Sequence, residues 1–144
     1  MNRMEVKFDA VLENEPFART VVASFIAPMN PTMDELIEIK TILSEGVTNA
    51  MIHGYEGITK QEVKIKVVTE NREITITIED KGKGIENIEQ AKIPLFTTKG
   101  YLERSGMGLT IIESLSDRLE IHSSIGLGTT LVIHKMLKEE QSVV

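Results

Sequence analysis

The sequence has no cysteine, no excess of basic residues and no long apolar run, and each absence excludes a class of protein. Without cysteine, neither a disulfide framework nor a thiolate metal site can form, which fits a reducing compartment. Sixteen lysines and arginines against twenty-two acidic residues give a net charge of −6. No basic cluster stands out that would neutralise a phosphate backbone, so direct binding of nucleic acid is not expected.

The longest nearly apolar stretch covers residues 21–27 and is closed by Pro28. It is far shorter than the roughly 20 residues that span a bilayer. Charged residues recur throughout Met1–Asp9, which leaves no room for the apolar segment of a secretory signal. We therefore expect a cytoplasmic protein without membrane contact, with a single domain over residues 1–137 and a flexible tail over residues 138–144.

Apolar residues first alternate with charged ones and then recur at helical spacing. Met4, Val6 and Phe8 have the period of a half-buried strand. A helix is predicted to follow, with Asn14 as its N-cap, and to end before Pro28.

A second helix is predicted from a capping box, in which Thr32 precedes Glu35 by three residues. Apolar residues at steps of three and four continue to about His53, and Gly54 is expected to stop the helix.

The second half of the chain contains two pairs of strand patterns. Residues 63–67 and 74–78 alternate cleanly, with Glu70 and Asn71 expected in the turn between them. A third helix is predicted over residues 109–119, followed by a strand pair formed by residues 119–121 and by Thr130, Val132 and His134. This order predicts an α+β fold, a two-layer sandwich in which three helices cover one face of a mostly antiparallel sheet.

Glu45 and Asn49 lie four residues apart on the second predicted helix, so both side chains project from one face. A carboxylate can take a proton, and an amide oxygen is a suitable ligand for Mg²⁺. Taken alone, such a pair more often marks a solvated helix face.

Asp80 ends a strong strand pattern and is followed closely by Gly82 and Gly84. Glycines let a ligand approach the backbone, and a carboxylate at a strand end can accept a hydrogen bond from an exocyclic amine such as that of adenine. Taken alone, the motif is also typical of a tight turn. The spacing matches neither the Walker loop nor the dinucleotide-binding glycine motif.

Arg104, Gly106, Met107 and Gly108 lead into the third predicted helix. The first amide groups of a helix favour an anion such as a polyphosphate, and an arginine can grip its oxygens. An ordinary flexible hinge is the alternative interpretation. The glycine-rich and polar stretch before this motif predicts a mobile lid over residues 86–105.

Taken together and in this order along the chain, these motifs and Gly126-x-Gly128-Thr129-Thr130 resemble the GHKL superfamily of gyrase, Hsp90, histidine-kinase and MutL ATPases. The resemblance covers nearly the whole chain and implies the histidine-kinase-like ATP-binding sandwich. Within the superfamily, residues 45–50, 52–55 and 106–109 are similar to the bacterial anti-sigma-factor serine kinases, most closely to the sporulation members of that family.

The resemblance also implies the partners and the chemistry. Members of that family hold an RNA polymerase sigma factor inactive, phosphorylate a serine of an anti-anti-sigma protein, and work as homodimers. No histidine phosphoacceptor motif precedes the domain, which disfavours a sensor histidine kinase. A nucleotide-gated binding module and a plain ATPase remain as alternatives.

The residue roles carried over by resemblance assign Mg²⁺ and ATP or ADP to one site. Glu45 matches the catalytic carboxylate, Asn49 the Mg²⁺ ligand and Asp80 the adenine-reading residue, while Arg104 is expected to contact the γ-phosphate. The remaining nucleotide contacts are expected from Gly82, Gly84, Thr97, Thr98, Lys99, Gly106, Met107, Gly108 and Thr130.

Two residues outside these motifs are also candidates for function. Glu15 and Arg19 are spaced to form an ion pair on the first predicted helix, and they are candidate partner contacts.

Overall fold

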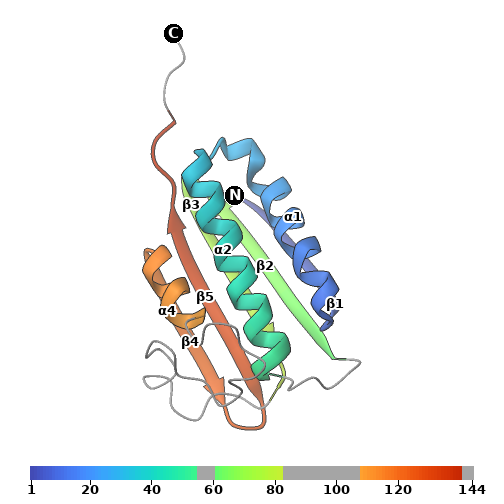
Figure 1. Ribbon diagram of the computed structural model, residues 1–144. Helices are drawn as coiled ribbons and strands as arrows, with labels where there is room; N and C mark the ends of the chain where they lie inside the picture. The colour runs from blue at the N-terminus through green and yellow to red at the C-terminus, as the bar shows by residue number, and fades with distance from the viewer. Residues whose placement is uncertain (55–60, 83–107, 141–144) are drawn as a thin grey trace.

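The computed structural model describes residues 1–54, 61–82 and 108–140 of the 144-residue chain. Figure 1 shows the order of the elements along the chain. They are β1 (Asn2–Asp9), the 3₁₀ turn η1 (Leu12–Asn14), α1 (Glu15–Ile26), the 3₁₀ turn η2 (Ala27–Met29), α2 (Met33–Asn49), the π-helical turn η3 (Ala50–Gly54), β2 (Glu62–Glu70), β3 (Glu73–Asp80), α4 (Gly108–Leu115), β4 (Arg118–Ser124) and β5 (Gly128–Met136).

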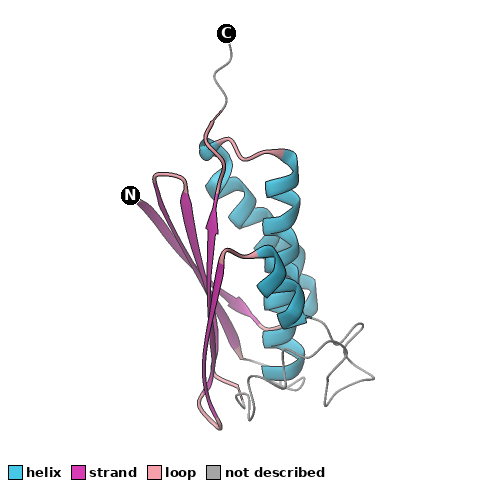
Figure 2. Ribbon diagram, turned by 90° about the vertical axis from the view of Figure 1, so that its left-hand side faces the viewer, coloured by secondary structure: helices cyan, strands magenta, loops and turns pink. Residues whose placement is uncertain are grey.

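The strands form one five-stranded sheet in the order β1-β2-β3-β5-β4. Every neighbouring pair is antiparallel. Helices α1, α2 and α4 lie together on one face of this sheet, as the side view in Figure 2 shows. The predicted α+β sandwich, with one sheet face covered by three helices, is confirmed.

The core lies between the helices and alternate residues of the strands. Ile74, Ile76 and Ile78 of the central strand β3 are at most 2% exposed. On β5 the buried apolar residues are Leu131 and Ile133. The expected set of Thr130, Val132 and His134 therefore belongs to the opposite face, because successive strand residues alternate between faces.

Both α1 and α2 start where the sequence predicts, but only α2 is capped in the predicted way. At α2, the Thr32 hydroxyl accepts from the Glu35 N–H and the Glu35 carboxylate accepts from the Thr32 N–H, so the capping box is confirmed. Asn14 does occupy the N-cap of α1 but makes no side-chain cap. Its amide donates instead to the carbonyl of Asp9, which ties the helix start to the end of β1.

The end of α2 departs from a regular α-helix. The α-helical hydrogen-bond pattern stops at Asn49, and a π turn continues from Ala50 to Gly54, where the helical stretch ends as predicted. Single π turns are rare and occur frequently at functional sites. Here the change of pitch follows immediately after the candidate Mg²⁺ ligand.

The turn between β2 and β3 lies one residue later than expected. Glu70 pairs with Glu73, so the turn residues are Asn71 and Arg72. Asn71 has φ of 54°, the left-handed conformation that asparagine tolerates better than most residues. The predicted lid over residues 86–105 lies outside the described residues.

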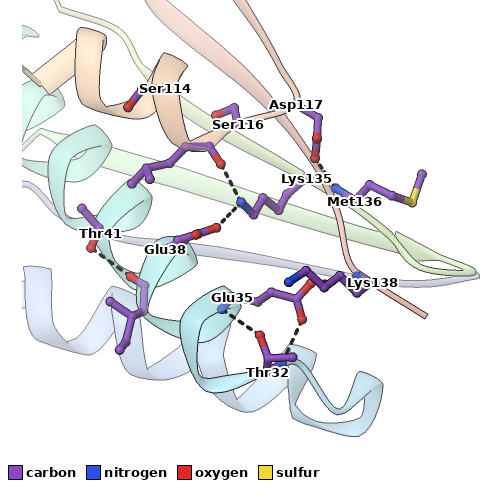
Figure 3. Close-up of polar contacts among 12 residues, drawn as sticks. Thr32, Glu35, Glu38, Thr41, Ser114, Ser116, Asp117, Lys135, Met136 and Lys138 are labelled. Atoms are coloured by element: carbon purple, nitrogen blue, oxygen red, sulfur yellow. Dashed lines mark hydrogen bonds and ion pairs between the residues drawn. The ribbon is translucent and has the colours of Figure 1, made fainter. Parts of the chain in front are cut away.

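A polar network fixes the end of the molecule where α2 begins (Figure 3). The second carboxylate oxygen of Glu35 accepts from the N–H of Lys138 at 2.8 Å. Lys135 donates to the Glu38 carboxylate and to the carbonyl of Leu115, the last residue of α4. We call this region, defined by Thr32, Glu35, Glu38, Lys135 and Lys138, the far end.

The far end also holds the first residues of the predicted tail. Arg72 donates to the carbonyls of Met29 and Lys138, and it pairs with Glu140 at 3.4 Å. Because three separate segments meet at one guanidinium, residues 138–140 are attached to the domain. Residues 141–144 lie beyond the described range.

Candidate functional site

Four predicted motifs meet at the opposite end of the sheet from the far end. They are the end of α2, the end of β3, the start of α4 and the start of β5, and Figure 1 shows α2 and the β4–β5 turn reaching this end together. We call it the site end and define it by Glu45, Asn49, Asp80, Gly108 and Thr129.

Glu45 and Asn49 are both half-buried and lie one turn apart on α2. Gly46, between them, allows the helix to approach β3 closely. A Cβ added to Gly46 would lie 2.5 Å from Cδ1 of Ile78, too close for any side chain without a shift of the core. The helix is therefore held near the end of β3, where Asp80 lies.

Asn49 contacts the first residue of α4. A Cβ added to Gly108 would lie 2.6 Å from Nδ2 and 3.0 Å from Oδ1 of Asn49. The candidate metal ligand and the start of the candidate phosphate-binding helix are thus in direct contact. Any side chain at position 108 would displace the Asn49 amide.

Asp80 is 7% exposed and closes β3. Its Oδ1 accepts from the N–H of Gly82 at 2.9 Å, and the N–H of Thr129 also donates to the carboxylate. Burial raises the pKa of Asp80 to about 6, although these two backbone hydrogen bonds oppose the rise. The carboxylate is therefore still ionised for the most part at neutral pH and retains unused acceptor capacity.

Gly128 permits this arrangement on β5. Its φ is 111°, in the region that L side chains rarely adopt. An added Cβ would overlap the carbonyl oxygen of Asp80 and lie 2.6 Å from Cα of Lys81. Only glycine lets β5 begin so close to the end of β3.

The strand register places Thr129 beside Asp80. Asp80 pairs with Thr129, and Thr129 pairs with Ser123 on β4, so the three residues form one row across three strands. Thr130 belongs to the next row, with Glu79 and His122, on the sheet face opposite α1, α2 and α4. The two rows face opposite sides, and the role of Thr130 as a nucleotide contact stays a prediction.

The sequence named Thr129 only as part of the last glycine motif, and it gave no indication of Ser123. The signal that could have found them is the alternation of β5, in which Thr129 is in phase with the buried Leu131 and Ile133. Ser123 required the pairing of β4 with β5, which no local pattern specifies.

A cavity of about 430 Å³ opens at the same end of the sheet. Its lining includes Glu79, His122 and Thr130, the row on the face opposite α1, α2 and α4, together with Asp80 and Gly128. Because the Glu45 and Asn49 side chains are not part of this lining, we do not assign the nucleotide to this cavity.

Several predicted site residues cannot be placed. Those that lie outside the described residues, and so stay predictions, are Gly84, Thr97, Thr98, Lys99, Arg104, Gly106 and Met107. Within the described ranges, the structure brings together Asn49 with Gly108 and Asp80 with Gly82.

The Glu15–Arg19 pair forms on α1 as predicted, with Nε and Oε1 2.8 Å apart. Phe17 and Leu12 are 47% and 59% exposed on the same part of the chain. A role in binding a partner stays a prediction. No helix among the described residues is long and apolar enough to cross a membrane.

The described residues fit a nucleotide in two ways. Asn49 lies so close to Gly108 that no side chain fits at the start of α4. A polyphosphate bound to the first amide groups of this helix would also require a residue without a side chain there. The buried carboxylate of Asp80 has acceptor capacity left for an amine. No cluster of three or more histidine, aspartate or glutamate side chains suited to a metal occurs in the described part, so a cation would need oxygens from its nucleotide.

Comparisons with known proteins agree on one family. The profile of the histidine kinase-like ATPase domain matches residues 8–135. Proteins described as anti-sigma F factor from Anoxybacillus flavithermus, Bacillus licheniformis and Bacillus cytotoxicus are each 51% identical over 142 residues, covering 99% of this chain and 97% of each relative. In fold, the chain is similar to a crystal structure of the RsbU and RsbW domains of a Mycobacterium tuberculosis protein, with a TM-score of 0.71, 17% identity, and coverage of 100% of this chain and 35% of that one.

Proposed function

This chain belongs to the histidine kinase-like ATPase family and, within it, to the anti-sigma F factors, and we propose that its site end binds Mg-ATP for phosphorylation of a protein serine. Nucleotide binding follows from the family. The Mg²⁺ ion, the serine specificity and the protein partners are the proposed part.

The observation that carries the proposal is Asp80. A buried carboxylate with a pKa raised to about 6 is costly, and its two backbone donors leave lone pairs unused. An exocyclic amine of a purine would supply the missing donor. The side chain is therefore better explained by a ligand than by the stability of the fold.

Asn49 is proposed to hold Mg²⁺ through its amide oxygen. Mg²⁺ keeps several waters and commonly takes few protein oxygens together with phosphate oxygens. The contact between Asn49 and Gly108 places this oxygen next to the N-terminal amides of α4, where phosphates would be favoured.

Glu45 is proposed to orient the incoming serine hydroxyl and to accept its proton. It lies one turn before Asn49 on the same helix face, so the base and the metal ligand would be held in a fixed relation. Phosphoryl transfer depends mainly on positioning and on neutralising charge, so few groups suffice. Arg104 is proposed to contact the γ-phosphate.

The proposed partners follow from the likeness to anti-sigma F factors. They are an RNA polymerase sigma factor that is held inactive, an anti-anti-sigma protein that receives the phosphate, and a second copy of this chain in a homodimer. The Glu15–Arg19 pair, beside the exposed Phe17, is the proposed contact for a protein partner. The cytoplasm is the proposed location.

The nucleotide site is tested by Asp80→Asn, with Glu79→Gln as the matched control. Both changes neutralise a carboxylate, but Glu79 lies on the other sheet face. The introduced asparagine would present an amide N–H to an amine, so we expect ATP affinity to fall at least about tenfold, by roughly 1.4 kcal/mol or more. Calorimetric titration with Mg-ATP measures this, and equal affinities for the two variants would refute the assignment.

Transfer is tested with γ-labelled ATP and a candidate anti-anti-sigma protein. Label on a serine of that protein supports the kinase. Nucleotide binding without transfer would instead indicate a nucleotide-gated binding module. Phosphate release at a comparable rate without any protein partner would indicate a plain ATPase.

A further inference from the structure

The outer side of α2 carries a stripe of uncharged side chains along the length of the helix. Its five members recur at steps of three and four, on the side opposite the buried residues of α2, and they are Met33, Ile37, Thr41, Ser44 and Thr48. Met33 is 70% exposed and Ile37 is 53% exposed. We call these five residues the α2 stripe. The outer side of a surface helix normally carries charged and polar residues, so two large apolar side chains there indicate a surface for another molecule.

Thr41 extends the apolar part of the α2 stripe. Its hydroxyl donates to the carbonyl of Ile37 at 2.8 Å, one turn earlier on the same helix (Figure 3). The hydroxyl proton is therefore already used within α2. An apolar surface lying on Thr41 would leave no donor there without an acceptor.

The α2 stripe is open to a partner of ordinary size. α2 lies between α1 and α4, and Figure 1 looks onto its outer side, over which no described element passes. The stripe begins at the far end with Met33 and reaches the site end with Thr48. It therefore connects the two ends of the molecule along one helix.

The α2 stripe also leads to Glu45. Residues three and four apart are neighbours on a helix surface, so Glu45 lies beside both Thr41 and Thr48. Ile37 precedes Glu45 by eight residues, which is about 12 Å along the axis at 1.5 Å per residue. A protein interface of usual size covers about 800 Å² on each partner, so one that covered Ile37 would extend to Glu45.

We propose that the α2 stripe is the docking surface for the protein that receives the phosphate, which covers Ile37 with an apolar patch and so brings its serine hydroxyl to Glu45. The inference rests on the proposed kinase function. A general base must lie within hydrogen-bond reach of the proton that it takes, so the acceptor protein has to approach α2 at Glu45. The inhibited sigma factor and a second copy of this chain have no such requirement, which is why we assign the stripe to the acceptor.

The variants that test this place a charge at the centre of the apolar part. Ile37→Glu and Ile37→Lys both introduce good helix formers, so α2 is expected to keep its structure. In both variants the KM for the acceptor protein should rise about tenfold, because a charge would be buried against an apolar patch. The kcat and the affinity for Mg-ATP should stay unchanged, because Ile37 lies two turns away from Glu45. Ile37→Leu should keep the KM of the unaltered protein.

The matched controls are Met136→Glu and Met136→Lys. Met136 is 54% exposed, nearly the same as Ile37, but it lies at the end of β5 on the sheet face opposite α1, α2 and α4. The net charge of the protein changes by the same amount in each pair of variants. Both controls should keep the KM of the unaltered protein.

The experiment measures transfer of label from γ-labelled ATP to the candidate anti-anti-sigma protein at a series of acceptor concentrations. The full chain and the five variants are compared, and calorimetric titration gives the affinity of each for Mg-ATP. Urea unfolding without nucleotide confirms that each variant is folded. A raised KM in both charged Ile37 variants, with normal values in Ile37→Leu and in the two Met136 controls, supports the inference.

Four results would overturn it while leaving the kinase function in place. They are a KM within about twofold of normal in both charged Ile37 variants, a rise for only one sign of charge, an equal rise in the Met136 controls, and a fall in kcat or in ATP affinity instead of a rise in KM. A normal KM together with lost sigma-factor binding, or with a changed oligomeric state, would give the stripe to another partner. If the unaltered protein transfers no label, the proposed function itself fails and the inference falls with it.

Discussion

Two carboxylates at opposite ends of the molecule are equally buried but have pKa values shifted in opposite directions. Asp80 at the site end is 7% exposed and has a pKa raised to about 6. Glu35 at the far end is 6% exposed; burial alone would raise its pKa, but hydrogen bonds from the backbone of Thr32 and Lys138 lower it overall. Exposed surface alone therefore does not decide the shift, because Asp80 lies deeper in the protein and accepts fewer hydrogen bonds than Glu35.

The comparison separates two uses of a buried charge. Glu35 is almost fully compensated, since the Thr32 hydroxyl adds to its two backbone donors and the positive charge of Arg72 attracts the carboxylate. Asp80 has two backbone donors and the unfavourable charge of Glu79 nearby. The far end is built for stability, whereas the site end keeps an unmet acceptor for a ligand.

The largest expected effect is on the rate of catalysis, with no change in stability. Glu45→Gln should reduce phosphoryl transfer about a thousandfold, because general-base contributions are typically of that order. ATP affinity and the free energy of unfolding should stay near those of the unaltered protein. Single-turnover transfer of labelled phosphate measures the rate. A near-normal rate would remove Glu45 from the chemistry of the site end.

Gly128→Ala should destabilise the site end by roughly 3 kcal/mol, because a positive φ and a backbone overlap act together. Gly126→Ala is the control, since Gly126 also has positive φ, 81°, but nothing lies within 4 Å of its added Cβ. That change should cost only about 1 kcal/mol. Urea unfolding measures both, and equal losses would show that the approach of Gly128 to Asp80 is unimportant.

Neutralising the two buried carboxylates should change stability in opposite directions. At pH 7.5, Asp80→Asn should raise the free energy of unfolding of the nucleotide-free protein by about 2 kcal/mol. Glu35→Gln should lower it by about 1–2 kcal/mol, since an amide cannot accept at both oxygen positions. Urea titrations measure both changes. A loss of stability in Asp80→Asn would contradict the comparison.

The pH dependence provides a second check on the same pair. The folded pKa of Asp80 lies above its usual value of 3.8, so the folded state binds more protons between about pH 4 and pH 6. Its contribution to stability is therefore lost as pH rises through that window, and Asp80→Asn should remove this slope. For Glu35, whose pKa is lowered, the contribution is present above the usual pKa and is lost as pH falls through the lowered one.

The smallest expected effect is at the far end. Lys135→Met should cost about 1 kcal/mol, because the Glu38 carboxylate and the Leu115 carbonyl lose a shared donor that is only 12% exposed. ATP affinity should not change, because these groups lie at the start of α2 and the end of α4. A parallel loss of affinity would show that the far end also positions Asn49 and Gly108.

Most of the fold could be predicted because its signals are local. The capping box of α2 and the alternation of β2 and β3 each lie within a short segment. The positions of Glu45, Asn49 and Asp80 on their helix and strand could be predicted from the same local patterns. Their mutual contacts could not be predicted in this way, because they depend on how closely Gly46 lets the helix approach the sheet.

Which of the two threonines lies beside Asp80 could not be predicted, for a physical reason. A shift of one residue along a strand moves a side chain to the other face, and Thr129 and Thr130 are identical in type. Their roles are separated only by the pairing of β5 with β3. The far-end contacts of Glu35 with Lys138 join residues about a hundred positions apart and leave no local pattern.

The strand order also governs when the site comes into existence during synthesis. Asp80 emerges from the ribosome with β3, but its neighbour Thr129 belongs to a strand made about fifty residues later. A growing chain that ends before residue 128 has the carboxylate without the row that completes it. Nucleotide binding is thus available only to a chain whose last strand has paired, and ATP, once bound, stabilises that finished state by mass action.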